Sequence, residues 1–254
     1  MKNRRKETIA ANFTETLVKV MNDTIDDLVY YGIDTSLKTR GHFIEKGLND
    51  FMEKYSVEFP ETNGKKVVSF SCSEAIYTLW HSSIFKEGST VERDRLSEIL
   101  RFGVCTFYWD IKQKRIDPSR YITYSRAPIK MKSFLINSEM KEKITSLANE
   151  LSLSFSKFME ASLLYSIDKH KNSLALLMSP SIIRTFCLEM QDKEVLDIFA
   201  GKLGSRSEFL RTSILLYIES MLPKIQEGKR KKETEIKEIP KEQIEMYRFY
   251  KLLR

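Results

Sequence analysis

The stretch "SRSEFLRTSILLYIES", residues 205–220, is repeated in weaker form upstream as "SFSKFMEASLLYSI", residues 154–167. Both stretches begin with Ser-x-Ser, have Phe two residues later, and carry a small serine four residues after the Phe. Self-similarity of this kind is typical of chains built from a repeated structural unit. We therefore expect the rest of the chain to contain further copies of the same element.

Each of these two predicted helices follows another predicted helix and, before that, a short strand-like run. In the earlier copy, "IKMKSFLIN" is the strand and "SEMKEKITSLANEL" the first helix, with apolar residues at three-to-four spacing. In the later copy, "SLALLM" (173–178) is the predicted strand. Ser179 and Pro180 are then the expected start of a helix that stops at Gly201–Gly204.

The N-terminal half has the same order. "KETIAANFT" (6–14) and "KKVVSFSCS" (65–73) are predicted strands, each followed by two predicted helices. Aligning the second helix of all four copies places an apolar residue at one position: Phe43, Ile99, Phe158 and Phe209. A small residue follows four positions later in every copy: Gly47, Gly103, Ser162 and Ser213. A small residue at a fixed helix position indicates that another helix crosses closely there.

The chain is therefore predicted to contain four strand–helix–helix units. Their expected bounds are 1–60, 61–110, 127–171 and 172–222, with a basic linker at 111–126 and a charged tail at 223–254. The predicted fold class is mainly α with short β-ribbons.

A strand followed by two helices, the second opening with Ser-x-Ser-Glu and a bulky apolar residue, resembles the ribbon-helix-helix family of DNA-binding proteins. The resemblance spans about 200 of the 254 residues and is strongest at 127–168 and 172–221. It implies that units pair through their strands into antiparallel ribbons. We expect units 1–2 and units 3–4 to form two intrachain pseudo-dimers.

The resemblance also implies a mechanism, in which each ribbon enters the DNA major groove and the second helices bind phosphates through their N-termini. Strand alternation gives the candidate base-facing residues: Thr8, Asn12, Lys65, Ser69, Ser71, Ser133 and Ser173. The candidate phosphate-binding residues are Arg4, Arg5, Lys6, Thr39, Arg40, Arg95, Ser97, Ser154, Ser156, Ser205, Arg206 and Ser207.

Units 3 and 4 depart from the DNA-reading pattern, because apolar residues such as Leu135, Ala175 and Leu177 are expected on their outer face. Such residues can touch a thymine methyl group but donate no hydrogen bond. Two interpretations follow: the C-terminal pair also contacts DNA, or it is an assembly module that has lost base readout. Self-association through this half or through the tail belongs to the second interpretation.

Composition limits the other function classes. The net charge of +7 favours an acidic partner, and the basic residues concentrate in 1–6, 110–127 and 223–254. The cysteines, Cys72, Cys105 and Cys187, have no metal-site spacing and favour a reducing compartment. With no membrane-length apolar run, signal peptide, nucleotide-binding loop or catalytic motif, we expect no enzyme, cofactor, metal or membrane.

The leading hypothesis is a double-stranded DNA-binding protein of the cytoplasm and nucleoid, acting as a transcriptional regulator or as a plasmid or virus maintenance factor. The alternative is a protein–protein assembly or antitoxin-like module that uses the same fold without reading bases. Steep salt dependence of duplex binding is expected of the first function only.

Overall fold

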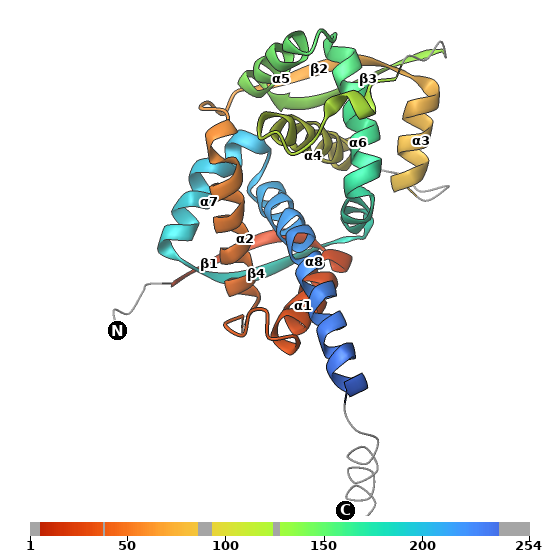
Figure 1. The fold of residues 1–254 in the computed structure, drawn as a ribbon. Coiled ribbons are helices and arrows are strands. Elements are labelled where there is room, and N and C mark those ends of the chain that lie inside the picture. The colour runs from red at the N-terminus through yellow and green to blue at the C-terminus, as the bar shows by residue number, and fades with distance from the viewer. Residues whose placement is uncertain (1–5, 38, 86–92, 124–127, 239–254) are drawn as a thin grey trace, which may run out of the picture.

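The computed structural model describes residues 6–37, 39–85, 93–123 and 128–238, and it is mainly helical with short antiparallel strand pairs (Figure 1). The sheet and helix elements in chain order are β1 (Lys6–Thr14), α1 (Glu15–Tyr30), α2 (Arg40–Tyr55), β2 (Lys65–Ser73), α3 (Glu74–Ile84), α4 (Arg93–Lys112), β3 (Ile129–Asn137), α5 (Ser138–Glu150), α6 (Phe155–Ala175), β4 (Ser181–Glu189), α7 (Met190–Leu203) and α8 (Arg206–Glu238). Short 3-10 turns lie at Ser56–Glu58, Pro118–Tyr121 and Leu176–Met178. No helix within these ranges is long and apolar enough to cross a membrane.

The order strand, helix, helix occurs four times, as the sequence predicts. The strand pairing, however, is nested. β1 pairs antiparallel with β4, and β2 pairs antiparallel with β3. The prediction that units 1–2 and 3–4 pair is therefore wrong. The first and fourth segments form one half of the molecule, called here the terminal half, and the second and third form the central half.

The fourth strand is also misplaced in the prediction. Residues 173–178 are not a strand, because α6 continues to Ala175 and a 3-10 turn follows. Pro180 begins no helix; its carbonyl oxygen instead accepts a hydrogen bond from the Glu15 N–H at the end of the ribbon. The β-branched and aromatic run after it forms β4, and the helix begins ten residues later than predicted, at Met190.

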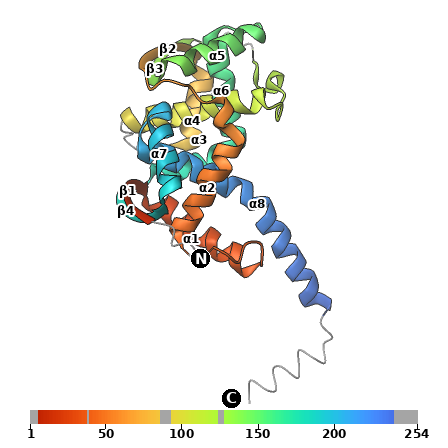
Figure 2. The same ribbon diagram turned by 90° about the vertical axis from the view of Figure 1, so that its left-hand side faces the viewer.

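Three predicted boundaries fall inside helices. The boundary at 171/172 lies within α6, that at 222/223 within α8, and that at 110/111 near the end of α4. The linker packs onto the body through Tyr121, which is buried and donates a hydrogen bond to Asp168. The first part of the predicted tail continues α8, which projects away from the rest of the chain (Figure 2).

Local sequence explains where the helices begin. Thr14, Thr39, Asn137 and Ser154 each occupy an N-cap, and each side-chain oxygen accepts a backbone N–H of the following turn. Period-two alternation fixes the inner faces of the strands, as predicted for the first three. The inward residues Ile9, Ala11, Phe13, Val68, Phe70, Cys72, Phe134 and Ile136 are all buried.

The small residues of the second helices lie where helices cross within each half. A Cβ atom on Gly47 of α2 would lie 3.7 Å from the Ser213 carbonyl oxygen of α8. A Cβ on Gly103 of α4 would come within 3.9 Å of the Ser162 carbonyl oxygen of α6. The repeated small position therefore contacts its counterpart in the partner segment, and the prediction of a close helix crossing is confirmed.

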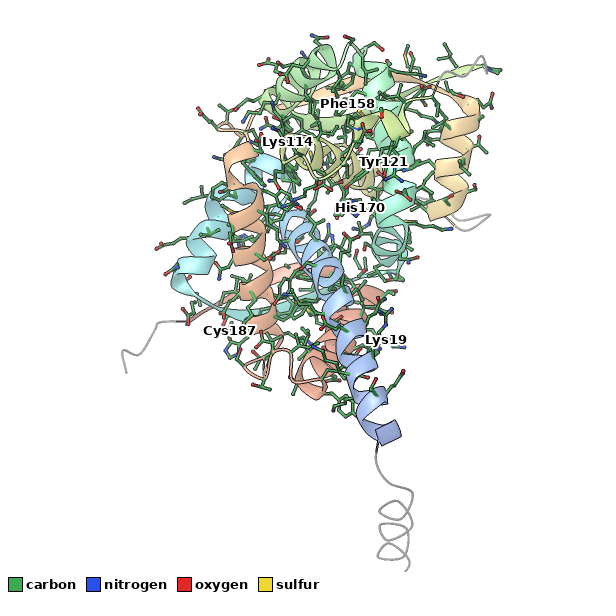
Figure 3. All side chains as sticks on the ribbon, in the orientation of Figure 1. Lys19, Lys114, Tyr121, Phe158, His170 and Cys187 are labelled. Atoms are coloured by element: carbon green, nitrogen blue, oxygen red, sulfur yellow. The ribbon has the colours of Figure 1, made fainter. Side chains whose placement is uncertain are left out.

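Aromatic packing joins the two halves. Trp109 of α4, in the central half, contacts the rings of Phe51 and Phe59 from the terminal half, both with centroids 5.6 Å away. At the other side of the contact, His170 of α6 bonds to Glu219 of α8 through Nδ1 at 2.9 Å. Figure 3 places Phe158 and Tyr121 in the upper, central half and Cys187 in the lower, terminal half.

The nested pairing predicts how the chain behaves when it is cut in the linker. Each ribbon takes one strand from residues 1–123 and one from 128–254, so neither fragment alone can complete a ribbon. We expect each fragment to be largely unfolded or aggregated alone, and their equimolar mixture to form a folded one-to-one complex. Circular dichroism and analytical ultracentrifugation of the fragments and the mixture measure this. Two fragments that each fold as monomers would contradict the pairing.

Candidate nucleic-acid interface

Each ribbon has one face turned away from the core. On the β1–β4 ribbon this outer face carries Thr8, Ala10 and Asn12 opposite Cys187, Thr185 and Ile183. On the β2–β3 ribbon it carries Val67, Ser69 and Ser71 opposite Leu135, Ser133 and Met131. Ser71 is half-buried and the other eleven residues are exposed, so both outer faces are open along most of their length.

The N-terminus of a second helix abuts the edge of each ribbon. In α8, Ser207 Oγ accepts the backbone N–H of Asn12 at 2.9 Å. At the equivalent place in α6, Ser156 Oγ accepts the N–H of Ser71 at 3.0 Å. In α2 the same position is Gly41, where an added Cβ would lie 2.6 Å from the Cys187 carbonyl oxygen. The second helices thus approach the ribbons closely with their positive, N–H-bearing ends.

One position of the second helices alternates in charge along the chain: Glu45, Arg101, Glu160 and Arg211. Glu45 accepts the Glu189 N–H and Glu160 accepts the Ser73 N–H, each at the end of a strand. Arg101 donates to the Leu135 carbonyl and Arg211 to the Asn12 carbonyl, in both cases within a strand. The first and third segments therefore carry the acid at this position, and the second and fourth carry the arginine.

Two reciprocal ion pairs hold the halves together. Arg211 of α8 donates to Glu98 of α4 at 2.7 and 2.9 Å, and Arg101 of α4 donates to Glu208 of α8 at 2.6 and 2.8 Å. These bidentate pairs are largely buried. Burial raises the pKa of the Glu208 carboxyl above its usual range, against the lowering effect of Arg101. A buried charge of this kind is tolerated only with its partner in place.

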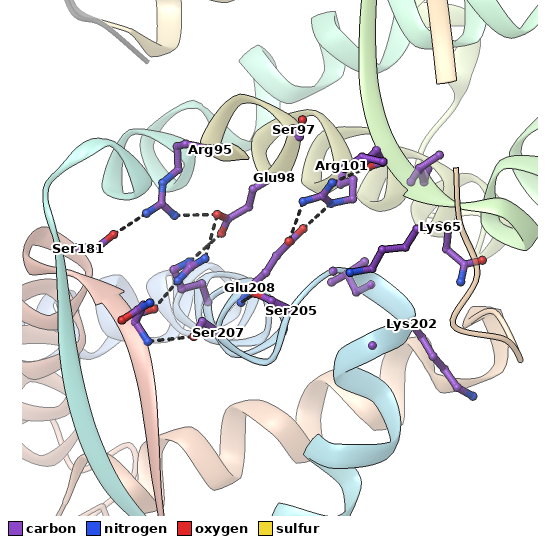
Figure 4. A pocket seen from close by; sticks show the side chains of 18 residues that line it. Lys65, Arg95, Ser97, Glu98, Arg101, Ser181, Lys202, Ser205, Ser207 and Glu208 are labelled. Carbon is purple, nitrogen blue, oxygen red and sulfur yellow. Dashed lines mark hydrogen bonds and ion pairs between the residues drawn. The ribbon is translucent and has the colours of Figure 1, made fainter. Parts of the chain in front are cut away.

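The ion pairs form the floor of a cleft between the two ribbons, about 640 Å³ in volume (Figure 4). Asn12 of β1 and Leu135 of β3, both from outer faces, line opposite parts of the cleft together with Lys65. Residues near the N-termini of α4 and α8 supply much of its other polar lining, together with Asn137, Ser181 and Lys202. Outward-facing residues of both ribbons therefore border one concave surface.

Most of the predicted base-facing residues lie on the outer faces of the ribbons. Thr8 and Asn12 are exposed on β1, Lys65 and Ser69 on β2, and Ser133 on β3, while Ser71 is half-buried on β2. The prediction that Ser173 faces the bases is wrong, because Ser173 is buried in α6 and its hydroxyl donates a hydrogen bond to Glu219. The error follows from the misplaced fourth strand, whose true outward residues are Ile183, Thr185 and Cys187.

The predicted phosphate-binding residues divide into three groups. At the N-termini of α2, α6 and α8 lie Thr39, Arg40, Ser154, Ser156, Ser205, Arg206 and Ser207. Arg95 and Ser97 lie in α4 but within the contact between halves: Arg95 bonds to Glu98 and Ser181, and Ser97 is buried. Arg4 and Arg5 lie outside the described residues, and Lys6 is the first residue of β1.

Several of these groups already have intramolecular partners. Arg40 bonds to Asn22, Arg206 to Asp197, and Ser205 Oγ accepts the Glu208 N–H at 3.2 Å. Sequence reasoning missed Glu98, Arg101, Glu208 and Arg211, although the alternation of Glu and Arg at one helix position was a usable signal for the two arginines. No group of His, Cys, Asp or Glu side chains in the described part of the chain is arranged to hold a metal ion.

Comparisons with protein-family models, curated proteins and solved structures find no match to this chain.

The reciprocal ion pairs predict a large and specific loss of stability. Glu98→Gln leaves the buried Arg211 and the half-buried Arg95 without their carboxylate, which should cost about 3–5 kcal/mol of unfolding free energy. Urea denaturation followed by circular dichroism measures this. Glu227→Gln is the matched control, because it removes the fully exposed pair with Lys231 and should leave the midpoint unchanged.

A second variant distinguishes the cost of an unpaired buried charge from the cost of lost side-chain packing. In Glu98→Leu/Arg211→Met both charges of the buried pair are absent and only the half-buried Arg95 is left without its carboxylate, so the double variant should recover part of the stability lost by Glu98→Gln. Equal losses for Glu98→Gln and Glu227→Gln would mean that the buried pairs do not hold the halves together.

Proposed function

We propose that this protein binds double-stranded DNA by inserting its antiparallel ribbons into the major groove, in the manner of the ribbon-helix-helix family. The major groove admits a two-stranded ribbon, and side chains on its outer face then reach the base edges. Four strand–helix–helix segments in one chain supply two such ribbons. The proposed role is that of a transcriptional regulator or a plasmid or virus maintenance factor.

The observation that carries the proposal is the exposed outer face of the ribbons combined with the helix N-termini at their edges. Helix N-termini offer backbone N–H groups and a partial positive charge to an anion. Thr39 of α2 and Ser154 of α6 stand at such ends, beside the outer edges of the two ribbons.

Base readout is proposed to depend chiefly on Asn12. Its side chain is exposed, whereas its backbone N–H and carbonyl are held by Ser207 and Arg211 of α8. The strand is thereby fixed and the amide is left to face the groove. An asparagine amide can bond the N6 and N7 edge of adenine at two points. Thr8 and Thr185 lie on the same face and add hydroxyl groups.

The nested pairing has a consequence for the DNA site. Each ribbon combines two strands of different sequence, and the two ribbons differ from one another. Palindromic operators reflect a true two-fold axis in the protein. The preferred site is therefore proposed to be non-palindromic.

The test is a binding titration on a duplex selected from a random pool, with Asn12→Ala as the variant. We expect a loss of about 1–3 kcal/mol on the selected site and a much smaller loss on scrambled DNA. Asn149→Ala is the control, since Asn149 is equally exposed but lies at the end of α5, away from the ribbons. Equal losses on selected and scrambled duplexes would remove Asn12 from base readout.

The second candidate function is protein–protein assembly through the ribbons. It is favoured by the apolar side chains exposed on the β2–β3 outer face, among them Met131 at 72% exposure. Salt separates the two functions, because DNA affinity that depends on phosphate contacts falls steeply between 50 and 200 mM salt, by ~10³ or more for six contacts. No measurable duplex binding at low salt would favour assembly.

A further inference from the structure

The outer face of the β2–β3 ribbon carries an apolar strip. Val67 is 60% exposed, Leu135, directly opposite, 40%, and Met131 further along the face 72%. Ile129 at the start of β3 is 73% exposed. These side chains point away from the core formed by Val68, Phe70 and Phe134, so their exposure is not explained by packing inside the central half.

The polar groups in the middle of the strip are turned toward each other. Ser69 and Ser133 are directly opposite, and their hydroxyl oxygens are hydrogen-bonded at 2.8 Å. One of the two hydroxyl protons is thereby used across the ribbon, which weakens the pair as a reader of base edges. The strip therefore offers a ligand mainly methyl and methylene groups.

The β1–β4 ribbon is different. Its outer face has the pair Thr8 and Cys187 where the β2–β3 ribbon has Val67 and Leu135. Ile183 occupies the place of Met131, and Asn12 and Thr185 occupy the places of two serines. The two ribbons therefore differ most at the Val67–Leu135 pair, which is apolar where its counterpart carries a hydroxyl and a thiol.

Charge around the strip indicates which partner it fits. Lys65 and Lys66 are exposed at the start of β2, and neither forms an ion pair with a carboxylate in the described part of the chain. On β3, Lys130 and Lys132 lie on the inward side of the strand, where Glu74 and the Tyr77 ring engage them. The exposed Lys65 and Lys66 therefore supply the positive charge beside the strip. An apolar strip with lysines at one end complements an anionic partner with an apolar centre. In the DNA major groove the apolar base-edge group is the thymine C5-methyl.

We propose that the β2–β3 ribbon recognises thymine methyl groups through Val67, Leu135 and Met131, while the β1–β4 ribbon reads an adjacent segment through hydrogen bonds. The inference rests on the proposed DNA-binding function and deepens it. The preferred site is bipartite, with a thymine-rich tract under one ribbon and an adenine contact under the other.

The test uses the full-length protein and its selected duplex, with the tract under the β2–β3 ribbon made either with thymine or with deoxyuridine. Deoxyuridine has the same hydrogen-bonding groups and lacks the methyl. Burying one methyl is comparable to burying one methylene, so affinity should fall about fourfold for each contacted methyl that is removed. Fluorescence anisotropy titrations measure both duplexes.

Variants connect the effect to the ribbon. In Val67→Ala/Leu135→Ala the difference between thymine and deoxyuridine duplexes should shrink toward onefold. Ile183→Ala, the matched variant on the other ribbon with 70% exposure, should keep the full difference. Because these side chains are on the surface, thermal melting of each variant should match the parent.

The outcomes separate this inference from the proposed function. Specific binding with equal affinity for thymine and deoxyuridine duplexes overturns thymine recognition and leaves DNA binding standing. Self-association that Met131→Ser abolishes, together with equal duplex affinities, would assign the strip to protein contact instead. No specific binding to any duplex overturns both proposals.

Discussion

The strand Lys6–Thr14 finds its hydrogen-bonding partner at the far end of the chain, in Ser181–Glu189. A single strand leaves its backbone groups unpaired and its apolar face uncovered, so β1 cannot form stable structure until β4 is present. Along the sequence, β2 and β3 lie between β1 and β4, and they pair with each other to form the ribbon of the central half. The pairing of β1 with β4 also brings α2 against α8, where Gly47 and Ser213 allow the helices to cross closely.

The contact between halves sets how the two ribbons stand relative to each other. Exchanging the first segment with the third and the second with the fourth reproduces the strand pairing and the ion pairs: the Glu98–Arg211 pair becomes Glu208–Arg101. The chain thus consists of two similar parts, the first two segments and the last two. Each segment pairs its strand with a segment of the other part. An arrangement of this kind fixes two ribbons on one concave surface, which a single pair of segments cannot do.

Much of this fold follows from sequence pattern. The strands β1, β2 and β3 were predicted at their observed positions, and period-two alternation assigned their inner faces correctly. The fourth strand was misplaced because "SLALLM" is a short apolar run of the kind that strands have. In the structure this run is the end of α6 and the 3-10 turn that follows it. A better signal was available: Pro128 and Pro180 each stand just before a nine-residue strand, and each carbonyl accepts the N–H of the residue that follows the partner strand.

The pairing of segments could not be read from proximity along the chain. By the loop-closure estimate, pairing β1 with β4 instead of β2 costs only about 1 kcal/mol more. Specific contacts easily exceed that amount. Such contacts are made by the alternating Glu45, Arg101, Glu160 and Arg211, which all bond to backbone groups of the partner segment's strand. Of the candidate site residues, Asn12 and Ser69 were placed correctly, and Ser173 failed with the strand that was supposed to carry it.

Two ribbons held on one concave surface and used for DNA binding require two separate contacts with the major groove. Interference by single 7-deazaadenine and deoxyuridine replacements along a selected duplex, with the intact protein, tests this most directly, because both replacements change only the major-groove edge of the base. Two separated tracts of interference within one duplex are expected, unlike in sequence and not related by a palindrome. A single tract, a palindromic pair, or no interference at either kind of replacement would contradict two groove contacts.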